Sequence, residues 1–327
     1  MLKERRKECL HEDDMDEVKN NVLRALDSEL RQMGGSLADF PDLPSPPPMS
    51  EHEHMTRVFQ EEVFNKRNQE NIVQLLKPLL NNEQADLCEA VHQAVLSVPG
   101  QKMQKLFILN SPGGYGKTFT FKLITAKVRS EGGIVLCVAT TGLAAQNLEG
   151  GRTAHSRFKI PIPVLEDSTC SIPVQSALAK LIQKADLIIW DEIFSSDRHN
   201  LECVERTIRD LMNSQELFGG KVICLGGDPR QTLPVVKRGS RAQIVRACLQ
   251  MSPLYINFKE FKLKMNMRTD KDEIEFSEYI LKLGDGREDI MEDINENCVK
   301  IPDRFLVKDR NGLIEILYFN HNSQLCC

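Results

Sequence analysis

Residues 105–128 read KLFILNSPGGYGKTFTFKLITAKV, and this stretch decides the fold. An apolar run of strand length, 105–110, leads into a glycine-rich loop, and a helix-like stretch, 117–130, follows it. Glycines let backbone N–H groups turn inward around phosphate oxygens, and the start of the next helix adds a positive dipole end. The pattern therefore predicts a phosphate-binding loop between a strand and a helix.

Two residues of this loop carry chemistry of their own. Lys117 can reach the β and γ phosphates of a nucleotide, and the Thr118 hydroxyl can bind Mg²⁺. The usual motif opens with glycine, where this chain has Ser111, but Gly113 and Gly114 supply the same backbone freedom. ATP and Mg²⁺ are the expected ligands, and the alternative interpretation is a glycine-rich turn that binds nothing. The expected nucleotide contacts are Pro112, Gly113, Gly114, Tyr115, Gly116, Lys117 and Thr118.

Beyond the loop, short apolar runs alternate with helix-like stretches. Alternation of this kind predicts an α/β fold, with a parallel sheet and helices on both faces. The predicted strands are 105–110, 134–140, 186–190 and 221–227, and the predicted helices are 117–130, 142–148, 198–213 and 241–250.

Two of these strands end in polar residues suited to nucleotide hydrolysis. Ligands of parallel sheets lie at the carboxyl ends of the strands, beside the phosphate loop. There Asp191 can hold Mg²⁺, and Glu192 can orient and deprotonate the water that attacks the γ phosphate. Gln231, in the turn after 221–227, is predicted to hydrogen-bond the γ phosphate and sense its loss. The alternatives are an acidic pair that caps the next helix and an ordinary polar turn.

Charge is unevenly distributed along the chain. The total is −5, yet residues 99–268 carry 24 basic and 14 acidic side chains, a net charge of +10. Such a block allows a polyanion-binding face, although ordinary scatter of surface charge is the alternative. No apolar run approaches the ~18 residues that would span a bilayer. The ten cysteines include no C-x-x-C pair, which favours reduced thiols over a zinc site.

Four segments are expected along the chain. The N-terminal one combines apolar residues at helical spacing with a proline-rich linker, and Pro99-Gly100 ends the helical stretch that follows. The expected boundaries are a helical extension and linker at 1–54, a helical lead-in at 55–100, a nucleotide-binding domain at 101–265, and the start of a further domain at 266–327.

Taken together, the motifs resemble the petite-integration-frequency (Pif) family of superfamily-one DNA helicases, most closely the helicases encoded by Helitron transposons. The similarity extends over roughly 60–310, and six motifs occur in the family's order. It implies a RecA-like core, to which we expect this chain to add a helical N-terminal extension and an incomplete second motor domain. The stretches that carry it are SPGGYGKT, VATTGLAAQNLEGGRTAHSRFKI, IIWDEI, LECVERTIRDL, CLGGDPRQTLPVV and MNMR.

The resemblance also implies roles for residues outside the loop. Gln84 is expected to contact the adenine base, and Arg268 to approach the γ phosphate from a second motor domain. It assigns Gln231 the role of γ-phosphate sensor, and Phe158 is a candidate for stacking on a base. Small hydroxyls and backbone N–H groups suit sequence-independent phosphate contacts. The expected single-stranded DNA contacts are Thr140, Thr141, Gly142, Thr153, His155 and Ser156.

The resemblance implies an ATP-dependent, monomeric helicase that moves 5′ to 3′ on single-stranded DNA. DNA repair, recombination or telomere maintenance is the expected setting, with the nucleus as default location and a mitochondrial form as the alternative. Pro229 departs from the aromatic residue usual in the family, and the family's later motifs do not occur, so we expect a truncated second domain. The alternatives are a transposon-derived module that binds ATP and DNA without unwinding, and an unrelated ATPase or kinase.

Overall fold

The computed structural model describes residues 35–45, 51–98, 102–267 and 274–287, together with several residues between 15 and 30 and between 299 and 309. The chain divides into two units. The first comprises Met1–Glu61 with Ser176–Leu178, and the second comprises Glu62–Gln175 with Ala179–Cys327. The second unit contains the sheet and every side chain discussed as a site below.

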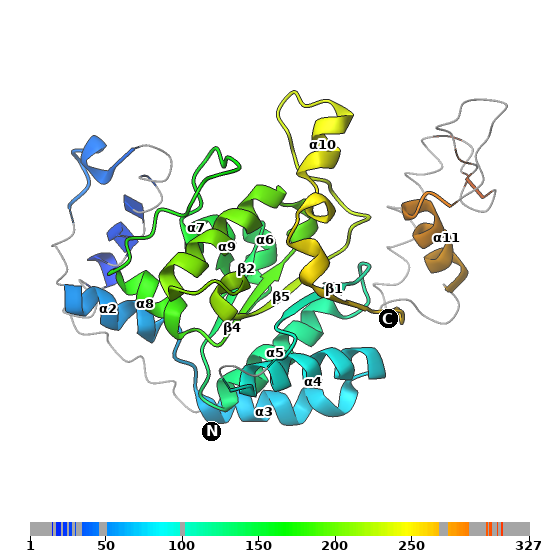
Figure 1. Ribbon diagram of the computed structural model, residues 1–327, viewed down its shortest axis with the longest axis horizontal. Helices are drawn as coiled ribbons and strands as arrows, with labels where there is room; N and C mark the ends of the chain where they lie inside the picture. Colours follow the sequence, from blue (N-terminus) through cyan, green and yellow to red (C-terminus); the bar gives the residue numbers. More distant parts are fainter. Residues whose placement is uncertain are drawn as a thin grey trace, which may run out of the picture. The chain divides into compact units, whose positions relative to one another are not determined.

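A six-stranded sheet forms the centre of the second unit (Figure 1). All neighbouring strands in this sheet pair in parallel, and the order across the sheet is β3-β2-β4-β5-β1-β6. The two-residue β3 and the lysine-containing β6 are therefore its edges. The strands are β1 (Leu106–Asn110), β2 (Val135–Ala139), β3 (Arg152–Thr153), β4 (Leu187–Asp191), β5 (Val222–Gly227) and β6 (Lys259–Lys262).

Helices cover both faces of the sheet, so its four inner strands are buried along almost their whole length. Burial on both faces explains why these strands are continuous apolar runs. On one face, Leu109, Cys137 and Ile189 pack with residues of α4 (Asn82–Leu96) and α5 (Lys117–Ser130). The remaining α-helices of this unit are α3 (Lys66–Leu76), α6 (Gly142–Gln146), α7 (Ala154–Phe158), α8 (Ala177–Lys184), α9 (Arg198–Met212), α10 (Arg241–Ala247) and α11 (Ile274–Gly284), with the start of α8 shared between the units.

Short 3-10 turns join several of these elements. Within the second unit they are η2 (Lys77–Leu79), η3 (Ile193–Ser195), η4 (Leu217–Gly220), η5 (Leu249–Met251) and η6 (Tyr255–Asn257). The first unit holds η1 (Leu37–Asp39) and α2 (Glu51–Gln60). Among residues 15–30, those that the structure describes are helical, in agreement with the amphipathic spacing.

The predicted α/β class is confirmed, and the four predicted strands lie within one residue of the observed ones. Helix α5 has the predicted bounds. The sequence reasoning missed β3, which has only two residues, and β6, whose residues KEFK lack an apolar run. The predicted segment 266–327 lies largely outside the described residues, apart from α11 and single positions.

Four of the six cysteines that the structure describes lie in the interior of the second unit. Cys137, Cys170, Cys203 and Cys224 are buried free thiols, and Cys88 and Cys248 are half-buried and also free. Burial raises the pKa of Cys88 to about 12, so this thiol stays protonated at neutral pH. Among the helices that the structure describes, none is long and apolar enough to cross a membrane.

Candidate functional site

The loop between β1 and α5 has the left-handed backbone turns that let N–H groups face a phosphate. Gly114 and Gly116 have φ values of 89° and 88°, in the left-handed region that favours glycine. Gly116 is the residue from which α5 starts. The N–H of Ser111 donates to the carbonyl oxygen of Gly227 at 3.0 Å, which fixes the loop entrance to β5. Ser111, which stands where the usual motif has its first glycine, is itself buried and is not among the non-glycine residues with a positive φ.

Lys117 lies against the two carboxylates at the end of β4. Its Nζ is 2.6 Å from Oδ1 of Asp191, and it also contacts Oε1 of Glu192. Asp191 is 3% exposed, and burial raises the pKa of its carboxyl while Lys117 opposes that rise. The phosphate loop and the acidic pair, predicted from stretches about 70 residues apart in sequence, therefore form one cluster.

Glu192 has an unusual backbone conformation for its residue type. Its φ is 53° and its ψ is 37°, and strain of this kind costs about 1–3 kcal/mol and clusters at functional sites. Its N–H donates to Oδ1 of Asp191 at 2.8 Å, and its carbonyl oxygen accepts from the Ser195 hydroxyl at 2.8 Å. These bonds hold the carboxylate beside the loop.

The residues predicted to hold Mg²⁺ fit that ion in their chemistry. Thr118 is an exposed residue in the first turn of α5, and Asp191 supplies a carboxylate. Within the described residues, no group of three or more His, Cys, Asp or Glu side chains is arranged to hold a metal. A nucleotide-bound Mg²⁺ needs only one or two protein oxygens, because phosphates and waters complete its octahedron.

Gln231 lies beside the phosphate loop in the turn that follows β5. A Cβ added to Gly113 would be 3.9 Å from Nε2 of Gln231. The same Nε2 is 3.4 Å from Oδ2 of Asp228, which is 6% exposed. The geometry brings the predicted sensor to the loop, and its role as a sensor stays a prediction. Asp228 and its neighbour Arg230 are contacts that the sequence reasoning missed.

Gln84 is buried at the start of α4, against the phosphate loop. Its Oε1 accepts from the N–H of Asn81 at 3.1 Å, and its Nε2 lies 3.5 Å from the carbonyl oxygen of Tyr115. A Cβ on Gly116 would approach that Nε2 to 2.5 Å, so glycine is required at this position. Both ends of the amide contact the chain itself, and base contact by Gln84 stays a prediction.

The chain returns to the phosphate loop after β6. The N–H of Leu263 donates to the carbonyl oxygen of Asn110 at 3.2 Å, and the N–H of Met267 donates to that of Gly114 at 2.9 Å. Met267 precedes Arg268, the predicted arginine, which lies outside the described residues. The third residue of the sequence motif MNMR thus contacts the loop directly.

The predicted DNA contacts lie at the ends of two neighbouring strands. Ala139 of β2 is paired in register with Thr153 of β3, so the residues after each strand share one edge of the sheet. Thr141 starts α6, where its hydroxyl accepts from the N–H of Ala144 at 3.3 Å. Gly142 is exposed, with open space beside its Cα. Thr140 accepts from the indole of Trp190 at 3.2 Å, which orients its hydroxyl.

Thr153 plays the same capping role one strand further on. Its hydroxyl accepts from the N–H of Ser156 at 3.3 Å at the start of α7. His155 in the same turn is half-buried, and burial lowers its pKa, so the imidazole is neutral at pH 7. Both turns present hydroxyls and helix-starting N–H groups, and neither depends on a charged imidazole.

The prediction that Phe158 offers a stacking face for a base is wrong. Phe158 is 1% exposed, and its ring packs on Trp190 with centroids 6.1 Å apart and planes 30° apart. Phe158 is the last residue of α7, and its side chain is buried in the core. The aromatic ring therefore stabilises the turn from beneath and is not available to DNA.

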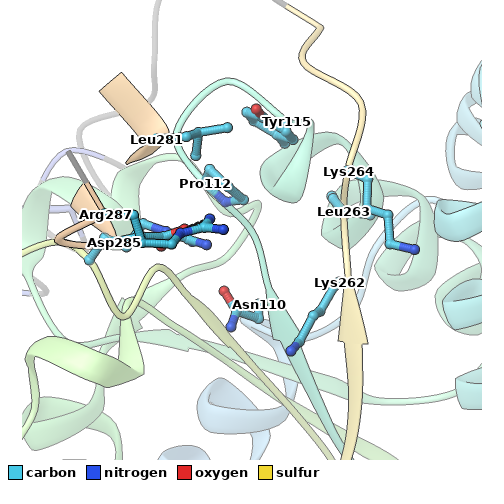
Figure 2. A pocket seen from close by; sticks show the side chains of 10 residues that line it. Asn110, Pro112, Tyr115, Lys262, Leu263, Lys264, Leu281, Asp285 and Arg287 are labelled. Atoms are coloured by element: carbon cyan, nitrogen blue, oxygen red, sulfur yellow. Dashed lines mark hydrogen bonds and ion pairs between the residues drawn. The ribbon is translucent and has the colours of Figure 1, made fainter. Parts of the chain in front are cut away.

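A cavity of about 280 Å³ lies on the outer side of the phosphate loop (Figure 2). Pro112 and Tyr115 line it from the loop, Lys262 and Lys264 from β6 and the residues after it, and Leu281 from α11. Arg230, in the turn after β5, and Asp285 and Arg287, just after α11, complete the wall of the cavity. The cavity shows that three chain segments, distant in sequence, meet beside the loop.

Comparison with known proteins assigns this arrangement to a family. The sequence model described as PIF1-like helicase matches residues 79–293, about two thirds of the chain. The ATP-dependent DNA helicase Pif1 of a Psychrobacter species is 27% identical over 182 residues, which are 55% of this chain and 28% of that protein. The ATP-dependent DNA helicase PIF4 of Trypanosoma brucei brucei is 29% identical over 126 residues, 37% of this chain and 15% of that one.

Solved structures support the fold. Bacteroides Pif1 helicase in complex with ADP-AlF3 and single-stranded DNA aligns with a TM-score of 0.54 at 23% identity, over 65% of this chain and 48% of that one. Pif1 helicase from Candida albicans aligns with a TM-score of 0.51 at 23% identity, over 69% of this chain and 45% of that one. The chain thus spans less than a third of the curated relatives described and about half of the solved ones.

Proposed function

Because this chain belongs to the PIF1-like helicase family, we propose that it binds ATP at the phosphate loop and couples ATP hydrolysis to 5′-to-3′ movement on single-stranded DNA. One observation carries the proposal: Lys117 and the carboxylates of Asp191 and Glu192 form a single cluster at the carboxyl ends of β1 and β4. This is the edge of a parallel sheet at which ligands bind.

Hydrolysis would use groups that already lie around the loop. The N–H groups at the start of α5 and the Lys117 ammonium neutralise charge on the β and γ phosphates. Glu192, held beside Lys117, accepts the proton of the attacking water. Gln231 hydrogen-bonds the γ phosphate, because its amide lies next to Gly113. Thr118 and Asp191 would hold Mg²⁺, which neutralises phosphate charge when bound.

Lys117 would exchange partners when the nucleotide binds. In this structure its ammonium is shared by two carboxylates. A triphosphate offers more negative charge, and Mg²⁺ offers the carboxylates another cation. Moving Lys117 to the phosphates therefore frees Glu192 to act as the base without leaving a charge unpaired.

Single-stranded DNA would bind along the edge formed by Thr140–Gly142 and Thr153–Ser156. The support is that two neighbouring strands end in hydroxyl-capped helix starts. Such groups contact phosphates without reading bases. The net charge of +10 over residues 99–268 supplies the long-range attraction. Bacteroides Pif1, whose structure holds single-stranded DNA, is the relative that motivates this ligand.

The test is ATP hydrolysis by the 327-residue chain with and without an unstructured oligonucleotide. We expect DNA to stimulate turnover, and we expect no hydrolysis by the Lys117→Ala variant. A strand-displacement assay on a 5′-tailed duplex then separates the two functions that the sequence leaves open. Unwinding supports a helicase, whereas DNA-stimulated hydrolysis without unwinding supports a module that binds ATP and DNA. Absence of ATP hydrolysis under all conditions would contradict both.

The finer assignments rest on the sequence resemblance. We propose membership of the Helitron-related branch, a monomeric state, and a nuclear role in DNA repair, recombination or telomere maintenance. Sedimentation of the purified chain tests the monomeric state, and the distribution of a tagged chain between nuclei and mitochondria tests the location.

A further inference from the structure

Arg230 lies between two carboxylates that belong to distant parts of the chain. Its Nη1 is 3.3 Å from Oδ1 of Asp228 in the same turn, and its Nε donates to Oδ1 of Asp285 at 2.5 Å. Asp285 directly follows α11, 55 residues further along the chain. The guanidinium therefore joins the turn after β5 to the end of α11.

Asp228 connects this bridge to the phosphate loop. Its Oδ1 contacts Arg230, and its Oδ2 lies 3.4 Å from the amide of Gln231. Asp228 is buried, whereas Gln231 is exposed and its amide lies near Gly113 of the loop. A continuous series of contacts thus runs from Gln231, which lies near Gly113, through Asp228 and Arg230 to the end of α11.

The end of α11 is shaped to receive the arginine. A Cβ on Gly284 would lie 3.3 Å from Cδ of Arg230, so the stem of the arginine packs closely on that glycine. Hydrogen bonds to Arg230 and Arg287 lower the pKa of Asp285, which keeps its carboxylate charged. Figure 2 shows Asp285 and Arg287 at the end of α11, on the side of the cavity near Pro112.

We propose that Arg230 is a positioning residue that couples the nucleotide state of the phosphate loop to the position of α11. The inference rests on the proposed ATP site. When the amide of Gln231 turns to the γ phosphate, it leaves Oδ2 of Asp228, and the shared carboxylate then reorients with Arg230. Because Arg230 also holds Asp285, the end of α11 shifts with the turn. Loss of the γ phosphate reverses the shift.

The experiment measures hydrogen exchange in residues 274–287 of the full chain, with Mg-ADP or with a non-hydrolysable Mg-ATP analogue. Two matched variants each remove one arginine from Asp285: Arg230→Met breaks the link to the sensor turn, and Arg287→Met does not. We expect exchange to differ about fivefold or more between the nucleotides in the unmodified chain and in Arg287→Met, the low end of typical couplings. We expect the difference to vanish in Arg230→Met and in Asp285→Asn.

Binding of a fluorescent ATP analogue is titrated in parallel. We expect Asp285→Asn to bind it like the unmodified chain, and Arg230→Lys to restore part of the exchange difference. A nucleotide-dependent difference that persists in Arg230→Met, or is lost equally in Arg287→Met, overturns the role of Arg230. An unmodified chain that binds the analogue without any change in 274–287 overturns the coupling alone, whereas one that binds no nucleotide overturns the proposed function as well.

Discussion

The second unit contains two clusters in which oppositely charged side chains pair, and the two clusters differ in how buried they are. In one, Lys117 contacts the carboxylates of Asp191 and Glu192, and the side chains of Lys117 and Glu192 are 12% and 28% exposed. In the other, Arg129 and Arg157 approach the carboxylate of Glu62, and all three side chains are at most 3% exposed. In the first, two carboxylates share one cation, whereas in the second two arginines share Glu62 and Arg129 also pairs with the carboxylate of Glu149 at 3.4 Å.

The difference lies in what else each cluster holds. Arg129 also donates to the carbonyl oxygens of Glu149 and Val135 and stacks over the ring of Phe64 at 3.4 Å, so its guanidinium is fixed on several sides. Within the described part of the chain, the hydrogen bonds and ion pairs of the Lys117 ammonium are those with the two carboxylates. We call the cluster of Glu62, Arg129 and Arg157 closed, because it holds segments of the chain together. We call the cluster of Lys117, Asp191 and Glu192 open, because its lysine can change partners. We therefore expect substitutions to affect stability in the closed cluster and catalysis in the open one.

The largest effect is expected for Lys117→Ala. We predict that hydrolysis falls below detection and that ATP binding weakens greatly, because the loop loses its charge on the β and γ phosphates. Steady-state ATPase and titration with a fluorescent analogue measure the two losses. Lys122→Ala, an exposed lysine on the same helix, is the matched control. Near-normal turnover in Lys117→Ala would refute the assignment of the phosphate loop.

Glu192→Gln comes next in size. This change keeps the shape of the side chain and removes the base, so we predict turnover lowered by about 10²–10⁴-fold with ATP binding retained. Single-turnover hydrolysis measures the chemical step apart from binding. If the affinity for Mg-ATP fell in parallel with turnover, Glu192 would be a structural residue or a metal ligand, and the open cluster would not be catalytic.

Arg157→Met tests the closed cluster. Removal of one partner from a buried ion pair leaves Glu62 without its nearest cation, and such changes cost about 3–5 kcal/mol of unfolding free energy. Urea denaturation followed by circular dichroism measures the loss, while the affinity for ATP is expected to stay unchanged. Lys127→Met is the control, since its exposed pair with Glu131 is worth only about 0.3–0.5 kcal/mol. A loss below about 1 kcal/mol for Arg157→Met would show that the clusters do not differ as argued.

The smallest effect is expected at the helix starts. Thr141→Ala removes a helix cap worth about 0.5–2 kcal/mol. It also removes one proposed hydroxyl contact to DNA. We predict that the affinity for single-stranded DNA falls about two- to tenfold, the value of roughly one hydrogen bond. Fluorescence anisotropy with a labelled oligonucleotide measures it at fixed salt. Gln146→Ala, exposed on the same helix, should bind DNA normally. Equal losses in both variants would remove Thr141 from the DNA-binding edge.

The sequence predicted the parts of the site that local pattern determines. The loop, the start of α5 at Lys117 and the end of β4 at Asp191 follow from glycine placement and apolar runs within short windows. The alternating order of strands and helices places these parts at one edge of a parallel sheet. This order predicts that the phosphate loop and the acidic pair lie close together. It does not predict that Lys117 contacts Asp191 and Glu192.

What the sequence did not predict depends on contacts between distant residues. The pairing of Arg230 with Asp285 joins positions 55 apart, and no local pattern indicates it. Phe158 ends a five-residue helix, too short for its apolar face to be read from spacing, so its packing on Trp190 could not be foreseen. β6 is held by pairing with β1 rather than by its own hydrophobicity.

The edges of the sheet also bear on how copies of the protein behave toward one another. An unpaired strand edge is a template on which a second chain can add a strand and begin an aggregate. Here one edge, β3, is only two residues long, and the other, β6, exposes Lys259, Glu260 and Lys262. Shortness and charge each discourage strand addition. The two edges of the sheet therefore both resist the addition of a strand from another copy of the chain. This resistance favours solubility at high concentration.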